Sequence, residues 1–257
     1  MRLGVEGRTA VVLGSTSGLG WATARALADE GAQIVIVGRD EDRAKARASS
    51  LPAAIAVAID LTEDSAPEHL LTVTQKEFGP VDILVLNGGG PKPSAALELT
   101  PEDVESTMKL LLSPYLELVN RVAPGMAERG WGRIIAIGSS GVQQPIPQLA
   151  ASNVGRSALA GYLKTLAAEL APAGITVNMA LPGRIDTDRV SNLDRATAER
   201  TSRSPEDVRN ASQASIPAGR YGRPEEFAAI VTFLAGDPAA YITGEQIRCD
   251  GGMIRAH

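Results

Sequence analysis

The sequence has few of the features that mark an extracellular or membrane protein. Cys249 is the single cysteine among 257 residues, so no disulfide can form within one chain and no thiolate cluster can bind a metal. No apolar run approaches the roughly 18 residues of a membrane-spanning helix, and residues 1–6 lead into no signal-peptide core. These absences predict a cytoplasmic protein without a metal site and without membrane contact.

Positive charge is also in short supply. Lysine and arginine number 25 against 30 aspartate and glutamate residues, a net charge of −5 that gives no reason to expect nucleic acid as a partner. Aromatic residues make up only 4% of the chain, whereas 44% hydrophobic and 21% charged residues are ordinary for a globular protein with a large core. The length suits one α/β domain or two small ones.

Glycines interrupt the chain between a short apolar run, Ala10–Leu13, and a helical pattern that begins at Trp21. Gly14 permits a tight turn, Gly18 lets backbone approach a pyrophosphate, and Gly20 lets the helix pack closely on the strand. The helix would point unpaired N–H groups and the positive end of its dipole at the phosphates. The spacing is G-x-x-x-G-x-G instead of the commoner G-x-G-x-x-G. We predict a dinucleotide-binding turn made of Gly14, Ser15, Thr16, Ser17, Gly18, Leu19 and Gly20.

Strands and helices are expected to alternate along the rest of the chain. Apolar runs predict strands at 33–37, 54–59, 82–86, 133–137, 175–180 and 246–249. Helices are expected from about 41 on, at 65–78, at 101–129 with a kink at Pro114, at 149–170 and at 224–235. Continuous apolar strands indicate a parallel sheet covered on both faces. The prediction is one Rossmann-type doubly wound α/β domain over residues 1–257, with about seven strands and ligands at their carboxyl ends.

Residues 184–220 are polar, weakly periodic and too long for a routine connection, so we expect a lid or a substrate loop. Five arginines there would suit an anionic substrate, namely Arg184, Arg189, Arg195, Arg200 and Arg203. Three aspartates in the same segment offset that charge, namely Asp186, Asp188 and Asp194.

Further short motifs accompany the glycine turn: Asp60-Leu61, Asn87-Gly88-Gly89, Gly138–Ser140, Asn178, Pro182-Gly183 with Thr187, and Asp250–Gly252. With them the chain resembles the short-chain dehydrogenase/reductase family, of the 3-oxoacyl-acyl-carrier-protein reductase type, over nearly its whole length. The resemblance implies a nicotinamide cofactor, hydride transfer to or from a small-molecule carbonyl or alcohol, and a homotetramer. It also implies that Asp60 and Leu61 meet the adenine and that Asn87, Gly88 and Gly89 meet the adenosine ribose. The nicotinamide would lie along Pro182, Gly183, Ile185 and Thr187.

Arg39 bears on the choice of cofactor. It follows the second predicted strand, whose end approaches the ribose 2′ position. A carboxylate there would repel a 2′-phosphate, whereas a guanidinium offers a fork of donors that matches phosphate. We therefore expect NADP(H) to be favoured over NAD(H); the alternative is a surface arginine paired with the neighbouring Asp40.

The chain departs from the family where catalysis is expected. The family places of the catalytic serine, tyrosine and lysine fall on Ser139, Ser152 and Arg156, and that of a helical asparagine falls near Leu111. Ser152 and Arg156 share a helix face, and Arg156 can also hold ribose hydroxyls of the cofactor. Serine is a much weaker acid than a tyrosine of pKa about 10, and arginine cannot release its proton. Possible substitutes are Tyr115, Tyr162, Lys164, Tyr221, Asp186, Asp188, His69 and His257.

Three functional hypotheses remain. The first is an NADP(H)-dependent oxidoreductase with a rearranged proton donor. The second is a redox-inactive protein on the same fold that binds a nucleotide for a structural or regulatory purpose. The third is a cofactor-independent lyase, which ranks last because the glycine turn is intact.

Overall fold

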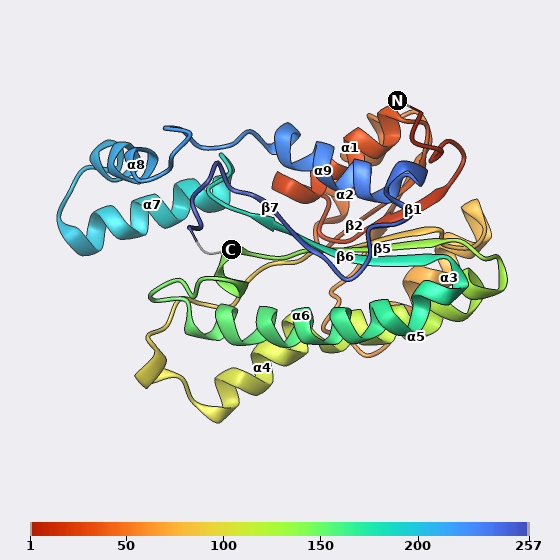
Figure 1. Ribbon diagram of the computed structural model, residues 1–257, viewed down its shortest axis with the longest axis horizontal. Helices are drawn as coiled ribbons and strands as arrows, with labels where there is room; N and C mark the ends of the chain where they lie inside the picture. Colours follow the sequence, from red (N-terminus) through yellow and green to blue (C-terminus); the bar gives the residue numbers. More distant parts are fainter. Residues whose placement is uncertain (1, 256–257) are drawn as a thin grey trace.

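A seven-stranded parallel sheet organises the computed structural model, which describes residues 2–255 (Figure 1). The strands follow the spatial order β3-β2-β1-β4-β5-β6-β7. Their bounds are β1 Thr9–Val12, β2 Gln33–Gly38, β3 Ala54–Ala58, β4 Ile83–Leu86, β5 Gly132–Ile137, β6 Ile175–Pro182 and β7 Gln246–Cys249. The chain moves outward in one direction from β1 to β3 and in the other from β4 to β7. The order therefore reverses between β1 and β4, where ligands of such sheets bind.

Helices cover both faces of the sheet, as Figure 1 shows. On one face lie α1 (Gly18–Asp29), α2 (Glu41–Ser49) and α9 (Pro224–Ala235). The other face carries α3 (Ala66–Phe78), α4 (Pro101–Leu111), α5 (Ser113–Glu128) and α6 (Ala150–Leu170). Two more, α7 (Asp188–Thr201) and α8 (Pro205–Ala214), project beyond the carboxyl end of β6. The predicted doubly wound α/β fold is confirmed.

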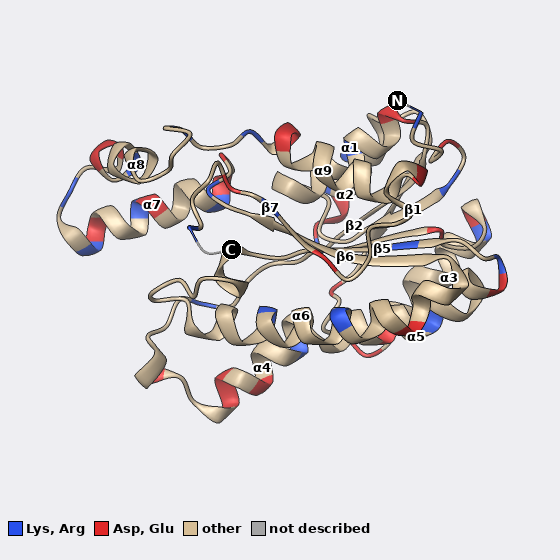
Figure 2. Ribbon diagram, in the orientation of Figure 1, with Lys and Arg blue, Asp and Glu red and all other residues tan. Residues whose placement is uncertain are grey.

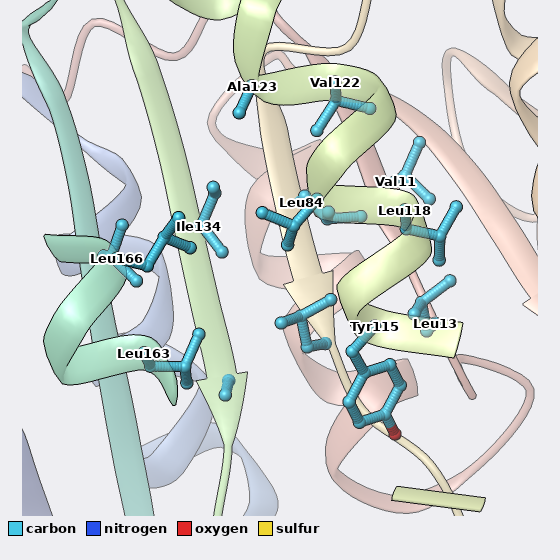
Figure 3. Packing of buried hydrophobic residues seen from close by; sticks show 14 of the residues in the cluster. Val11, Leu13, Leu84, Tyr115, Leu118, Val122, Ala123, Ile134, Leu163 and Leu166 are labelled. Carbon is cyan, nitrogen blue, oxygen red and sulfur yellow. The ribbon is translucent and has the colours of Figure 1, made fainter. Parts of the chain in front are cut away.

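The strand sequences explain the two cores. Successive residues of β1 point to opposite faces, so Val11 joins the cluster beside α5 and α6 while Val12 joins the cluster beside α1 and α9. Every residue of β1, β4 and β5 is buried, and apart from Thr9 and Arg133 these strands contain only apolar residues and glycine. Figure 3 shows part of the first cluster, in which Leu84 and Ile134 from the sheet face Leu118 and Leu163 from the helices.

One prediction of local structure was wrong. The single helix predicted over 101–129 is two helices, because α4 ends at Leu111 and α5 starts at Ser113. Pro114 lies in the first turn of α5, where it lacks the N–H that would continue the preceding helix. The 184–220 segment, predicted to be a lid or a substrate loop, contains α7 and α8. Their N-caps are Thr187 and Ser204, which accept hydrogen bonds from the backbone N–H of Val190 and Asp207.

Within residues 2–255, no helix is long and apolar enough to cross a membrane. Across the same residues, no group of three or more histidine, cysteine, aspartate or glutamate side chains is placed to hold a metal ion.

Candidate functional site

The glycine turn lies at the switch point of the sheet and is tied to the turn after β4. Gly14 and Gly18 both have a φ of +57°, a left-handed conformation that side chains disfavour. A Cβ added at Gly20 would collide with the carbonyl oxygen of Gly14, so α1 can pack this closely only on glycine. Asn87 donates its amide hydrogens to the carbonyl oxygens of Leu13 and Gly14 at 3.1 and 3.2 Å, which holds the two turns together.

The other residues of the turn have separate roles. Ser15 is fully buried, and its hydroxyl donates to Val12 and accepts from the N–H of Val37. The side chain of Ser15 therefore supports the turn from inside, and its predicted contact with the cofactor stays a prediction. Ser17 is the N-cap of α1 but its side chain caps no N–H, so the first-turn N–H groups stay available to an anion. Thr16 is partly exposed, and Leu19 packs against the core. This cradle fits a pyrophosphate.

Arg39 and Asp60 share one hollow of about 450 Å³ at the ends of β2 and β3, lined also by Glu63 and His69. The Arg39 side chain is 81% exposed. Its guanidinium lies 3.9 Å from the Asp60 carboxylate, which is a long distance for an ion pair, so Asp60 holds it weakly. Hydrogen bonds from the N–H and hydroxyl of Thr62, with a smaller effect of Arg39, hold the pKa of Asp60 below its usual value. Leu61 is partly buried against the core. The hollow thus offers one loosely held guanidinium beside one ionised carboxylate.

The turn after β4 exposes backbone on one side and touches a tyrosine on the other. A Cβ added at Gly89 would meet nothing within 4 Å, so the backbone there is open to a ligand. A Cβ added at Gly88 would lie 2.6 Å from the hydroxyl oxygen of Tyr115. Tyr115 was one of several possible substitutes in the sequence, and the structure brings it to this turn.

The segment after β6 runs back to the glycine turn. Pro182 ends β6, and Gly183 packs so tightly against Asp250 that an added Cβ would lie 2.6 Å from its Cα. Ile185 is buried. A Cβ added at Gly18 would lie 3.8 Å from the methyl group of Thr187, so the start of α7 faces the glycine turn.

Ser139, Ser152 and Arg156 lie near the carboxyl ends of β5 and β6. The Ser139 hydroxyl accepts a hydrogen bond from the N–H of Gly141 at 3.1 Å. Arg156 donates from Nη1 to the carbonyl oxygen of Ile137 at 3.0 Å, which fixes its guanidinium at the end of β5. Burial lowers the pKa of Arg156, Tyr115 opposes that effect, and Arg189 adds to it. Ser152 is 7% exposed. A guanidinium with unused donors therefore stands where a cofactor's ribose could be held.

The 184–220 segment is fastened by two ionic contacts that its sequence alone did not reveal. Arg184 donates to the buried carboxylate of Asp194 at 3.0 Å, and that carboxylate also accepts from the hydroxyl of Tyr221 at 2.8 Å. Arg209 forms a two-pronged pair with Asp186 at 2.7 and 3.1 Å. Figure 2 shows charges of both signs on α7 and α8. Tyr221 and Asp186 are thereby engaged, which weakens their case as proton donors.

The remaining possible substitutes lie elsewhere. The hydroxyl of Tyr162 is buried without a hydrogen-bond partner, and Lys164 donates to the carbonyl oxygen of Gly244 at 2.8 Å. His69 lines the hollow beside Arg39. His257 lies outside the described residues.

The strand order and the glycine turn at its switch point place the protein in the class of Rossmann-type dinucleotide-binding folds. A family model described as enoyl-(acyl carrier protein) reductase matches residues 14–254. The chain belongs to this family of short-chain dehydrogenases/reductases.

Individual relatives match the chain along almost its full length. The 3-oxoacyl-[acyl-carrier-protein] reductase FabG of Vibrio cholerae is 34% identical over 252 residues, which are 98% of this chain and 99% of the relative. The L-sorbose reductase of Gluconobacter frateurii, solved with NADPH and L-sorbose, superposes with a TM-score of 0.94 at 32% identity over 100% of both chains. A variant of actinorhodin polyketide ketoreductase, solved with NADPH, gives 0.91 at 30% identity over 97% of this chain and 98% of that chain.

Proposed function

We propose that the protein is an NADP(H)-dependent oxidoreductase that interconverts a carbonyl and an alcohol, of the 3-oxoacyl reductase type. The observation that carries this proposal is the cradle formed by Gly14, Gly18 and Gly20, which the Asn87 amide ties to the turn after β4. The named relatives that match the whole chain are reductases, and two of them were solved with NADPH.

Each part of the cofactor would meet a different element. The N–H groups at the start of α1 would receive the pyrophosphate, and Arg39 the 2′-phosphate in the hollow beside Asp60. The Asn87–Gly89 turn would hold the adenosine ribose, and Arg156 the nicotinamide ribose. Pro182, Gly183, Ile185 and Thr187 would lie along the nicotinamide. A bound nicotinamide would supply or accept the hydride.

Two arrangements of this chain bear on the substrate. The Ser139 hydroxyl accepts a backbone N–H and keeps its own hydrogen for donation, so it can orient a carbonyl oxygen. The α7–α8 segment would then cover the substrate, since Thr187 already faces the glycine turn. Excluding water in this way strengthens the polar contacts around a reacting carbonyl.

A pair of matched variants tests the cradle. Gly18→Ala and Gly130→Ala each place a side chain at positive φ, +57° and +65°, with nothing nearer than 3.8 Å to the added Cβ. Each costs backbone strain of roughly 1–2 kcal/mol, but only the first methyl group intrudes on the predicted pyrophosphate. We expect Gly18→Ala to weaken NADPH binding at least tenfold in a calorimetric titration and Gly130→Ala to leave it unchanged. Equal affinities in all three proteins would contradict the proposal.

One observation supports the redox-inactive hypothesis. The positions at which the family has its catalytic tyrosine and lysine are occupied here by Ser152 and Arg156. Tight NADPH binding with no oxidation of NADPH by a 3-oxo thioester or any of a broad set of ketones would favour it. Measurable turnover would dismiss it.

We also propose a homotetramer with closed symmetry. The aromatic ring of Tyr241 is fully exposed near the edge strand β7, and Val154 is exposed on α6. Burial of such groups against other copies of the chain would remove apolar surface from water.

A further inference from the structure

Tyr115 places a phenol at the edge of the candidate site from a helix that the family motif does not use. The residue lies in the first turn of α5, and only 3% of it is exposed. Figure 3 shows its ring at one end of the packed cluster, with the hydroxyl oxygen pointing away from the apolar side chains. That oxygen lies so close to Gly88 that an added Cβ would be 2.6 Å from it. The phenol therefore reaches the turn predicted to line the cofactor. Because β4 pairs with β5 and Leu86 lies opposite Ala136, this turn lies beside the end of β5 that leads to Ser139.

The hydroxyl of Tyr115 is not engaged elsewhere. The hydroxyl of Tyr221 donates a hydrogen bond to Asp194 of α7, so that hydroxyl is already engaged. Among residues 2–255, by contrast, no hydrogen-bond partner holds the Tyr115 hydroxyl. The Tyr115 hydroxyl is not among the fully buried side-chain atoms without a partner, so solvent reaches this oxygen although the ring is buried. A bound group can therefore take the place of water at the hydroxyl.

A cation accompanies the phenol. Arg156 uses one guanidinium nitrogen on the Ile137 carbonyl oxygen, which leaves its other N–H groups available. Burial raises the pKa of Tyr115 to about 12, and the positive charge of Arg156 acts in the opposite direction. Arg189 of α7 is a second positive charge near Arg156. The tyrosine is therefore protonated at neutral pH, and a phenolate formed there would face positive charge.

We propose that Tyr115 and Arg156 form the phenol–cation pair of this enzyme, with Tyr115 as the proton donor that Ser152 cannot be. The proposal rests on the proposed function. In reduction, the π bond of the carbonyl breaks as carbon gains hydride from NADPH and oxygen gains the proton that leaves the Tyr115 hydroxyl. The proton passes directly or through one bridging hydroxyl group. Water returns a proton to the phenolate, which Arg156 stabilises meanwhile. A phenol is a far stronger acid than an aliphatic alcohol, so the transfer to an alkoxide is downhill.

The first test needs no turnover. The chain has four tyrosines, so a protein labelled with ¹³C at tyrosine Cζ gives four carbon signals that substitutions assign directly. We expect NADPH to move the signal that Tyr115→Phe removes and to leave that of Tyr162 in place. Arg156→Ala should also move the Tyr115 signal in the free protein. A Tyr115 signal that shifts neither on NADPH addition nor in Arg156→Ala would overturn the pairing.

The second test is kinetic and uses a 3-oxo thioester as substrate. Tyr115→Phe keeps the buried ring, and Tyr162→Phe is the control because it makes the same change on α6, where the lost hydroxyl is buried without a partner. We expect Tyr115→Phe to lower kcat by about 10²-fold or more, with the NADPH Kd within about twofold of wild type, and Tyr162→Phe to change neither. A kcat within threefold of wild type, or a loss confined to NADPH affinity, would overturn the proton-donor role. No turnover by wild type, with a Tyr115 signal that responds to NADPH, would refute the proposed function and leave the pairing supported.

Discussion

Replacing Arg39 with aspartate should reverse the preference between the two nicotinamide cofactors. The Arg39 side chain is 81% exposed, and among residues 2–255 its one ion pair is with Asp60 at 3.9 Å. Such an exposed pair contributes at most about 1 kcal/mol, so the guanidinium is nearly free to bind a 2′-phosphate. Asp60 lies in the same hollow, and its negative charge opposes the phosphate.

The size of the effect follows from these two charges. A hydrogen bond to a charged group contributes about 1.5–3 kcal/mol, and exposure and the nearby carboxylate favour the lower end. About 1.5 kcal/mol corresponds to roughly tenfold tighter binding of NADPH than of NADH. Arg39→Asp removes that contact and adds a repulsion on the order of 1 kcal/mol in water, while a carboxylate can accept from a free 2′-hydroxyl. The preference should therefore pass to NADH by about tenfold.

Calorimetric titration of both cofactors into both proteins measures the two ratios. Lys76→Asp is a control of equal charge change on α3, about 10 Å along the helix from His69, which lines the hollow. It should leave the ratio as in wild type, and higher salt should shrink the wild-type preference. Equal affinities of wild type for the two cofactors, or a ratio that Arg39→Asp does not change, would refute the reasoning.

Other expected outcomes concern the remaining parts of the site and the assembly. Arg156→Ala should raise the NADPH Kd about tenfold in the same titration, because ribose hydroxyls lose a charged donor. Ser152→Ala should lower kcat less than tenfold, and a loss of about 10³-fold would assign Ser152 the acid role instead. Arg209→Ala should increase hydrogen exchange in α7 and α8. Arg209 holds the pKa of Asp186 below its usual 3.8, so the pair stabilises the segment above that pH and the effect is lost as pH falls through the lowered pKa. Both side chains are at least 36% exposed, so the loss is at most about 1 kcal/mol. Light scattering should give a tetramer at micromolar concentration, and a monomer would contradict the proposed assembly.

The sheet could be predicted from sequence because its strands carry their own signal. Strands that are buried on both faces are rich in continuous apolar runs. The short runs Ile83–Leu86 and Ile134–Ile137 therefore predict such strands. The glycine turn could also be predicted from sequence. Gly14 and Gly18 adopt positive φ, and at Gly20 a Cβ would collide with the neighbouring backbone. Glycine meets both requirements without cost, so its spacing carries the signal.

Segments held by tertiary contacts could not be predicted in the same way. The helices α7 and α8 are mostly polar, and contacts such as Arg184–Asp194 and Asp186–Arg209 fasten them. Periodicity of apolar residues is therefore a weak signal there, and the caps at Thr187 and Ser204 were the better one. The buried hydroxyl of Ser15 shows the same limit, because a motif position does not say which way its side chain points.

The wrongly predicted helix and the proposed acid meet at the break between α4 and α5. The chain breaks at Leu112, the N–H of Tyr115 bonds to the Leu112 carbonyl oxygen at 3.0 Å, and Pro114 lies in the first turn of the new helix. The new start directs the ring of Tyr115 along the sheet to Gly88. A search for a tyrosine and lysine four residues apart on α6 cannot find this phenol, because its cation, Arg156, lies on a different helix and 41 positions later in the sequence. The start of α5 thus supplies the phenol of the proposed pair, and α6 supplies its cation.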